Sequence, residues 1–130
     1  MTTATLQAQS FSVMLTANDL DRSLRFYGDG LGFAVVQKYE DKGVVRGAML
    51  EAGGAKLGLS QDDFAKGRNR IKGVGMGLYL ETTQDLAALA QRVKNAGIAF
   101  EQELGPLPWG PMAFTVKDPD GFKLTLASPS

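Results

Sequence analysis

The chain has 130 residues, 44% of them hydrophobic and 22% charged, which is typical of one folded globular domain. Its 14 basic and 14 acidic residues balance, so no overall field attracts nucleic acid or an anionic membrane surface. The absence of cysteine excludes disulfide bonds, and the absence of histidine removes the commonest metal ligand and general base.

The N-terminal residues and the hydropathy pattern indicate where the protein resides. Residues 1–10 lack the basic start and the apolar stretch of a signal peptide, and no apolar run approaches the roughly 18 residues of a membrane span. We therefore expect a cytoplasmic protein that binds neither nucleic acid nor membrane.

The first half of the chain predicts a strand, a helix and three further strands. Residues 12–17 alternate between polar and apolar side chains, which is the period of a strand. Asn18 or Asp19 then caps a helix, in which apolar residues recur at helical spacing until Gly32. Three strands follow, at residues 33–40, 44–52 and 55–61.

The second half repeats this order. A strand at residues 74–81 precedes an amphipathic helix that Asp85 caps and Gly97 ends. The remaining strands lie at residues 98–104, 112–118 and 122–128, and the turn sequence DPDG joins the last two as a hairpin.

Each half thus reads strand–helix–strand–strand–strand, and neither half covers its own sheet at this length. Two copies packed together enclose a cavity, which gives the duplication a physical reason. We predict one domain of residues 1–130, made of a βαβββ module at 10–60, a polar linker at 61–73 and a second βαβββ module at 74–128.

Two segments, NDLDRSLRFYGDGLGF at residues 18–33 and WGPMAFTVKDPDGFKLTLA at residues 109–127, resemble the vicinal oxygen chelate superfamily. This superfamily includes glyoxalase I, bleomycin resistance proteins, fosfomycin resistance enzymes and extradiol dioxygenases. The resemblance covers residues 11–127 and implies an α+β fold. In that fold, paired βαβββ modules form a cupped mixed sheet with helices on its convex face, often as a homodimer.

Enzymes of this superfamily hold a metal ion in the cup through two histidines and a glutamate. By resemblance these ligands align with Ser12, with Gly77 (or Met76 or Leu78 beside it) and with Thr125. None of these residues supplies an imidazole or a carboxylate, and the chain has no histidine to shift into place. The resemblance therefore implies a member without the family metal and without a cofactor.

The inward faces of the strands, with the inward sense taken from the family fold, supply the candidate ligand-binding residues. These are Ser12, Met14 and Thr16 of the first strand, Gly75, Gly77 and Tyr79 of the fifth, and Lys123 and Thr125 of the last. Glycine in a strand often marks close approach by a ligand, although alternating glycines also let a sheet bend. The alternative for Tyr79 is a half-buried residue of the sheet without a binding role. The alternative for Lys123 is a strand-end lysine whose ammonium group reaches solvent.

Trp109, the sole tryptophan, lies in the stiff sequence PLPWGP and is the candidate for stacking on a flat ligand. The alternative is a rim residue that covers the sheet edge. The basic run KGRNRIK, residues 66–72, is either a solvated loop or an anion-binding rim, since arginine forks suit carboxylate and phosphate.

No catalytic residue is predicted, because the sequence offers no Ser–His or Cys–His pair. Glu81, at a strand end, is the least explained acid and a candidate base. We assign other acids to structural roles: Asp19 and Asp85 to helix caps, Asp118 and Asp120 to the hairpin turn, and Asp62 and Asp63 to exposed turns.

These observations favour a metal-free binding protein that sequesters an aromatic or amphiphilic small molecule, such as an antibiotic. Two alternatives stay open: a glyoxalase-like lyase, isomerase or other enzyme with an atypical or absent metal site, and an accessory module whose cup is filled by its own side chains or by a partner. The sequence does not decide the ligand, any remaining catalysis, or whether one chain or a homodimer forms the cup.

Overall fold

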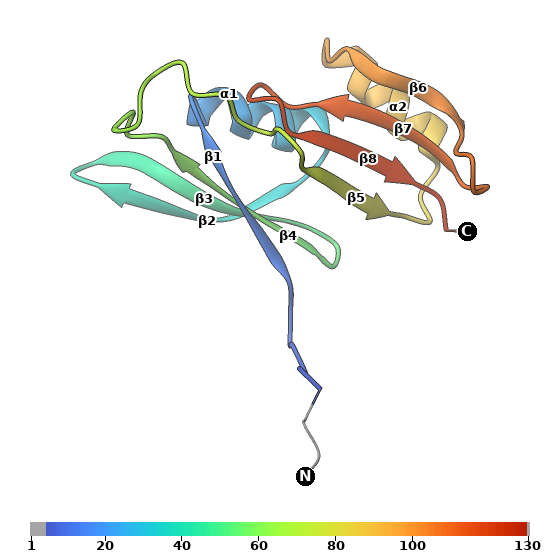
Figure 1. Cartoon of the computed structure of the whole chain (residues 1–130), viewed down its shortest axis with the longest axis horizontal. Helices are drawn as coiled ribbons and strands as arrows, with labels where there is room; N and C mark the ends of the chain where they lie inside the picture. Colours follow the sequence, from blue (N-terminus) through green and yellow to red (C-terminus); the bar gives the residue numbers. More distant parts are fainter. Residues whose placement is uncertain (1–4, 130) are drawn as a thin grey trace.

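The computed structural model describes residues 5–129, which form two four-stranded sheets (Figure 1). Residues 1–4 and 130, the ends of the predicted domain range, lie outside the described residues. The first sheet has the order β1-β4-β3-β2, from β1 (Ser12–Ala17), β2 (Ala34–Asp41), β3 (Val44–Ala52) and β4 (Ala55–Gln61). The second has the order β5-β8-β7-β6, from β5 (Gly77–Glu81), β6 (Phe100–Pro106), β7 (Met112–Lys117) and β8 (Lys123–Ala127).

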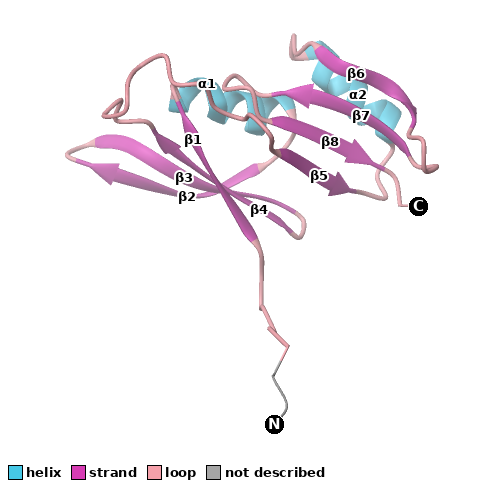
Figure 2. Cartoon of the chain, viewed as in Figure 1, coloured by secondary structure: helices cyan, strands magenta, loops and turns pink. Residues whose placement is uncertain are grey.

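Both sheets have the same mixed topology. Strands β1 and β4 pair in parallel, as do β5 and β8, and the other neighbours pair antiparallel. Figure 2 shows the helical segments packed beside the sheets. This repeated arrangement is the predicted α+β fold.

The helices begin at the predicted caps. The side chain of Asp19 accepts a hydrogen bond from the backbone N–H of Arg22 (3.2 Å), and α1 (Leu20–Arg25) follows. The chain then widens into the π-helical segment η1 (Phe26–Gly30), in which the N–H of Leu31 donates to the carbonyl of Phe26 (3.1 Å). In the second half, Asp85 caps α2 (Leu86–Asn95) in the same way.

One apolar core runs through both halves. Leu15 of β1 and Leu124 and Leu126 of β8 face this core. The largest fully buried apolar side chains come from both sheets, from η1 and from α2: Tyr27, Phe114, Leu50, Leu59, Leu124, Val93 and Val116. Because burial of each such side chain stabilises by roughly 1.5–3 kcal/mol, the two halves depend on one shared core.

A buried hydrogen bond joins the two halves at the DPDG turn. The hydroxyl of Tyr27 donates to Oδ2 of Asp118 (2.6 Å), and both residues are buried. The other oxygen, Oδ1, accepts the backbone N–H groups of Asp120 (2.8 Å) and Phe122 (2.9 Å). The sequence assigned Asp118 to the turn alone, whereas its carboxylate also holds the first-half helical segment.

Burial raises the pKa of Asp118 above its ordinary value of 3.8, and the hydrogen bonds from Tyr27 and from the two backbone N–H groups oppose this rise. Burial and the neighbouring carboxylate of Asp118 also raise the pKa of Tyr27, which keeps the phenol protonated and able to donate.

The linker is anchored to the first half at Asp62, whose backbone N–H donates to the carbonyl of Ala17 (2.8 Å). Asp62 is buried, so its assignment to an exposed turn was wrong. Its carboxylate binds Nζ of Lys72 (2.9 Å) and a guanidinium nitrogen of Arg70 (3.0 Å), and it accepts the backbone N–H of Phe64 (2.9 Å). The hydrogen bond from Lys72, followed by that from Phe64, holds the pKa of Asp62 well below its usual range.

The linker ends in a tight approach to the DPDG turn. Gly73 has φ of +74°, and a Cβ there would lie 2.6 Å from the backbone nitrogen of Phe122 and would collide with Gly121. Gly75 also has positive φ, +71°. Since a regular strand cannot contain these conformations, β5 begins at Gly77, and the predicted strand start at residue 74 was wrong.

Replacing Tyr27 by phenylalanine leaves a buried carboxylate oxygen without its donor, so we expect the free energy of unfolding at about pH 7 to fall by about 1–3 kcal/mol. The folded state binds the Asp118 proton more tightly than the unfolded chain. Protonation of Asp118 therefore contributes to the free energy of unfolding. This contribution is fully present below pH 3.8 and is lost as the pH rises through the pKa of Asp118 in the folded state. The loss in Tyr27→Phe should therefore shrink as the pH is lowered from about 7 to 3.8, because uptake of the proton by Asp118 removes the unsatisfied charge.

Urea unfolding of both proteins at the two pH values measures this difference. Tyr39→Phe, at a half-exposed tyrosine of β2, is the control and should change little. An equal loss at both pH values would show that Asp118 is not the group that needs the phenol.

Gly73→Ala and Gly75→Ala form a matched pair. Both place a side chain at positive φ, which costs about 1 kcal/mol. Only at Gly73 would the new Cβ also strike backbone atoms, whereas among the described residues nothing lies within 4 Å of the Cβ position at Gly75. We expect urea unfolding to show an additional loss of about 1–3 kcal/mol for Gly73→Ala. Equal losses would contradict the close approach.

Candidate functional site

The open face of the second sheet carries two adjacent rows of side chains. The strand register places Gly77, Lys123 and Lys117 side by side on β5, β8 and β7. The next row is formed by Tyr79, Thr125 and Thr115. The other face is apolar and is packed in the core, so these rows form the outward surface.

This face combines an aromatic ring, hydroxyl groups and free space. Tyr79 is 50% exposed. The hydroxyls of Thr125 and Thr115 form a hydrogen bond with each other (2.8 Å). Within the described residues, nothing lies within 4 Å of the Cβ position at Gly77. The strand surface at Gly77 is therefore bare, and it is bordered by Tyr79 along β5 and by Lys123 across on β8.

On the open face of the first sheet, by contrast, side chains cover the glycine. Met14 of β1 is 66% exposed, and Gly58 and Met49 are its register partners on β4 and β3. A Cβ at Gly58 would lie 3.0 Å from Sδ of Met49 and would collide with Met14. The two methionines thus fill the space above Gly58, which gives this face an adaptable apolar surface.

The sequence-derived site residues fall into two groups. Gly77, Tyr79, Lys123 and Thr125 share the open face of the second sheet. Ser12, Met14 and Thr16 lie together on β1, in the first sheet. Gly75 belongs to neither group, because its positive φ places it before β5, and its prediction as an inward-facing strand residue was wrong.

Trp109 lies in the turn between β6 and β7, where the N–H of Gly110 donates to the carbonyl of Leu107 (2.9 Å). Its side chain is exposed. Strand β7 runs from this turn to Lys117, so Trp109 and the Lys117–Lys123 row lie at opposite ends of the sheet, roughly 17 Å apart along the strand. One small ligand at Lys123 does not reach Trp109.

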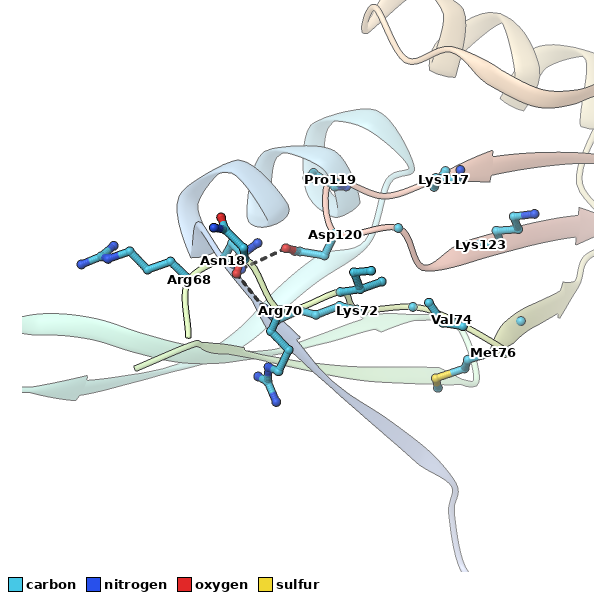
Figure 3. A pocket seen from close by; sticks show the side chains of 16 residues that line it. Asn18, Arg68, Arg70, Lys72, Val74, Met76, Lys117, Pro119, Asp120 and Lys123 are labelled. Atoms are coloured by element: carbon cyan, nitrogen blue, oxygen red, sulfur yellow. Dashed lines mark hydrogen bonds between the residues drawn. The ribbon is translucent and has the colours of Figure 1, made fainter. Parts of the chain in front are cut away.

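A hollow of about 890 Å³ lies where the linker meets the β7–β8 turn (Figure 3). Lys117 and Lys123 line it from the second sheet, and Val74 and Met76 line it from the short segment between the linker and β5. Asp120 also lines it, beside Asn18, and its carboxylate accepts hydrogen bonds from the backbone of Asn18 (3.0 Å) and the hydroxyl of Ser23 (3.4 Å).

The basic run of the linker is mostly engaged inside the protein. Arg70 and Lys72 bind Asp62, and Lys72 also donates to the side chain of Asn18 (2.6 Å). The guanidinium of Arg68 lies 4.5 Å from the ring centre of Phe64. These contacts stabilise the linker, so the run is neither simply solvated nor a rim of free cations.

Sequence reasoning missed Lys117, which lies beside Lys123. Both ammonium groups approach Oε1 of Glu101 on β6, at 3.5 Å for Lys117 and 3.7 Å for Lys123. Strand alternation could have placed Lys117 on this face. Lys117 and Thr115 face the side opposite the buried Val116. In the same way, Lys123 and Thr125 face the side opposite the buried Leu124.

The positions that the resemblance aligns with metal ligands do not fit the family metal. Ser12 offers a hydroxyl, Gly77 has no side chain, and Thr125 uses its hydroxyl in the bond to Thr115. Divalent ions such as zinc require imidazole, thiolate or carboxylate donors. Among residues 5–129, no three Asp or Glu side chains gather into a group that could hold a metal ion.

Comparison with known proteins agrees with the architecture. Residues 10–126 match the family model of the Glyoxalase/Bleomycin resistance protein/Dioxygenase superfamily. The chain belongs to this superfamily. It is 32% identical over 124 residues to a probable lactoylglutathione lyase of Vibrio cholerae, and the match covers 87% of this chain and 85% of the relative.

Two solved structures share the fold of this chain. TioX from Micromonospora sp. ML1 superposes with a TM-score of 0.75 at 21% identity, covering 93% of this chain and 98% of TioX. A superfamily member from Sphaerobacter thermophilus gives a TM-score of 0.74 at 23% identity, covering 95% and 98%. At these identities the likeness concerns the fold. In the described part of the chain, no helix has the length and apolarity to cross a membrane.

Divalent metals should not stabilise the protein, because the aligned positions lack suitable donors. A ligand at a hundred times its dissociation constant stabilises by about 2.7 kcal/mol, which shifts the melting temperature by several degrees. We expect no such shift with Zn²⁺, Ni²⁺, Mn²⁺ or Co²⁺, and no change with a chelator. Thermal unfolding with metal analysis of the purified protein measures this. A stoichiometric metal with a clear shift would overturn the argument.

Proposed function

We propose that this protein is a metal-free member of the superfamily that binds and sequesters a planar aromatic or amphiphilic small molecule, of which an antibiotic is one example. The observation that carries this proposal is the bare strand surface at Gly77. Gly77 aligns with a metal ligand of the family enzymes but has no side chain. The half-exposed ring of Tyr79 lies beside it.

The chemistry of the face suits such a ligand. An exposed aromatic ring offers a stacking surface, and stacking of a planar ring on an aromatic side chain contributes roughly 1–3 kcal/mol. The hydroxyls of Thr125 and Thr115 supply polar contacts that orient a ligand. Sequestration needs only these contacts, and it needs neither a nucleophile nor a metal.

A second copy of the chain is the proposed cover of the open faces. Large apolar side chains on the first sheet are exposed, among them Met14, Val36 and Tyr39. Exposed apolar surface of this extent is typical of an interface, and a closed two-fold dimer covers it on both copies at once. We therefore propose that a homodimer encloses the ligand.

The second candidate function is a glyoxalase-like lyase or isomerase. The 32% identity to the probable lactoylglutathione lyase supports it. In this chain the candidate acid–base groups for such a reaction are Tyr79 and Glu81, both on β5. Turnover of the hemithioacetal of methylglyoxal and glutathione distinguishes the two functions, because a binding protein leaves this compound unchanged.

We expect planar aromatic compounds to bind with micromolar dissociation constants, measured by calorimetry. Tyr79→Ala should weaken binding roughly tenfold because it removes the stacking ring. Tyr79→Phe is the matched control, since it keeps the ring, and should bind within about twofold of the wild type. Light scattering on the same samples should give the mass of two chains. Absence of binding together with hemithioacetal turnover would contradict the proposed function and favour the lyase.

A further inference from the structure

Two lysines face one carboxylate at the end of the open face. Lys117 and Lys123 are direct register partners on β7 and β8, and their side chains are 46% and 52% exposed. Both approach the same oxygen of Glu101. One negative charge cannot neutralise two positive charges, so this cluster retains an excess positive charge that faces solvent.

The other charges around the hollow do not cancel this excess. Five cationic side chains line it: Arg68, Arg70, Lys72, Lys117 and Lys123. Asp120 is the one acid among the lining residues that the structure describes. The carboxylates of Asp62 and Glu101 form ion pairs with these cations. Asp62 is engaged by Lys72 and Arg70, and Figure 3 shows Arg68 and Arg70 directed away from the two β-strand lysines.

The lysines also stand next to the free surface of the face. Gly77 is the cross-strand partner of Lys123, and Tyr79 lies two residues further along β5. Adjacent rows are about 7 Å apart, which is the span of a small aromatic ring system. A flat molecule that covers Gly77 and touches Tyr79 therefore brings a substituent on its far side within reach of Lys123 and Lys117.

From this arrangement we infer that the ligand is an organic anion: a planar body that carries a carboxylate or another anionic group. Lys117 and Lys123 select it over neutral and cationic molecules of the same shape, and the exposed side chains of Val74 and Met76 line the same hollow and offer apolar contacts. The inference rests on the proposed function and adds the charge of the ligand to it.

The test compares three probes of one shape: 2-naphthoate, neutral 2-naphthamide and cationic 2-naphthylmethylammonium. Calorimetry should give naphthoate an affinity about tenfold above that of naphthamide, with the cation weakest. Added salt should weaken only the naphthoate complex. Equal affinity for naphthoate and naphthamide would overturn this inference and leave the proposed function standing, whereas failure of every probe to bind would overturn both.

Three variants test whether the preference for the anionic probe comes from Lys117, Lys123 and Glu101. Lys117→Gln and Lys123→Gln should each weaken naphthoate binding about threefold and leave naphthamide binding unchanged. Glu101→Gln should strengthen naphthoate binding about threefold, because it removes the carboxylate that competes for the lysines. Lys94→Gln on α2, outside this face, is the control and should change neither. Loss of binding for both probes in a lysine variant, with an unchanged melting temperature, would contradict a role confined to charge.

Discussion

The buried carboxylate of Asp118 is the constraint on which the position of the site depends. It closes the DPDG turn through two backbone N–H groups and receives the hydroxyl of Tyr27 from the first half of the chain. The linker lies against the same turn at Gly73 and Gly121, and leads directly into β5. Strands β5 and β8, which carry the open face, are therefore held in place by contacts around one polar group that the apolar core encloses.

Two glycines on the open faces of the sheets show how one fold supports different surfaces. Gly58 lies on the open face of the first sheet, and Met14 and Met49 close over it. Gly77 lies on the open face of the second sheet and stays uncovered within the described residues. Family membership follows from the core and the turns, whereas the chemistry depends on such exposed positions, which vary without cost to the fold.

The strands and caps could be predicted from the sequence because alternation and capping are local properties. The strands β3 and β4 were predicted at their observed bounds, and Asp19 and Asp85 cap the helices. The start of β5 could not be predicted, because GVGMG alternates like a strand while glycine equally accepts positive φ. The burial of Asp62 and the pairing of Lys117 with Lys123 depend on contacts between distant segments, which periodicity does not encode.

The register of Lys117 and Lys123 also bears on how the protein evolves. Like charges directly opposite each other destabilise a sheet, and a shared Glu101 offsets part of that repulsion. Threonine or glutamine at either position would remove the repulsion and suit a strand at least as well. Selection for folding alone would thus replace these lysines, so their retention in a lineage would record selection on what the surface binds.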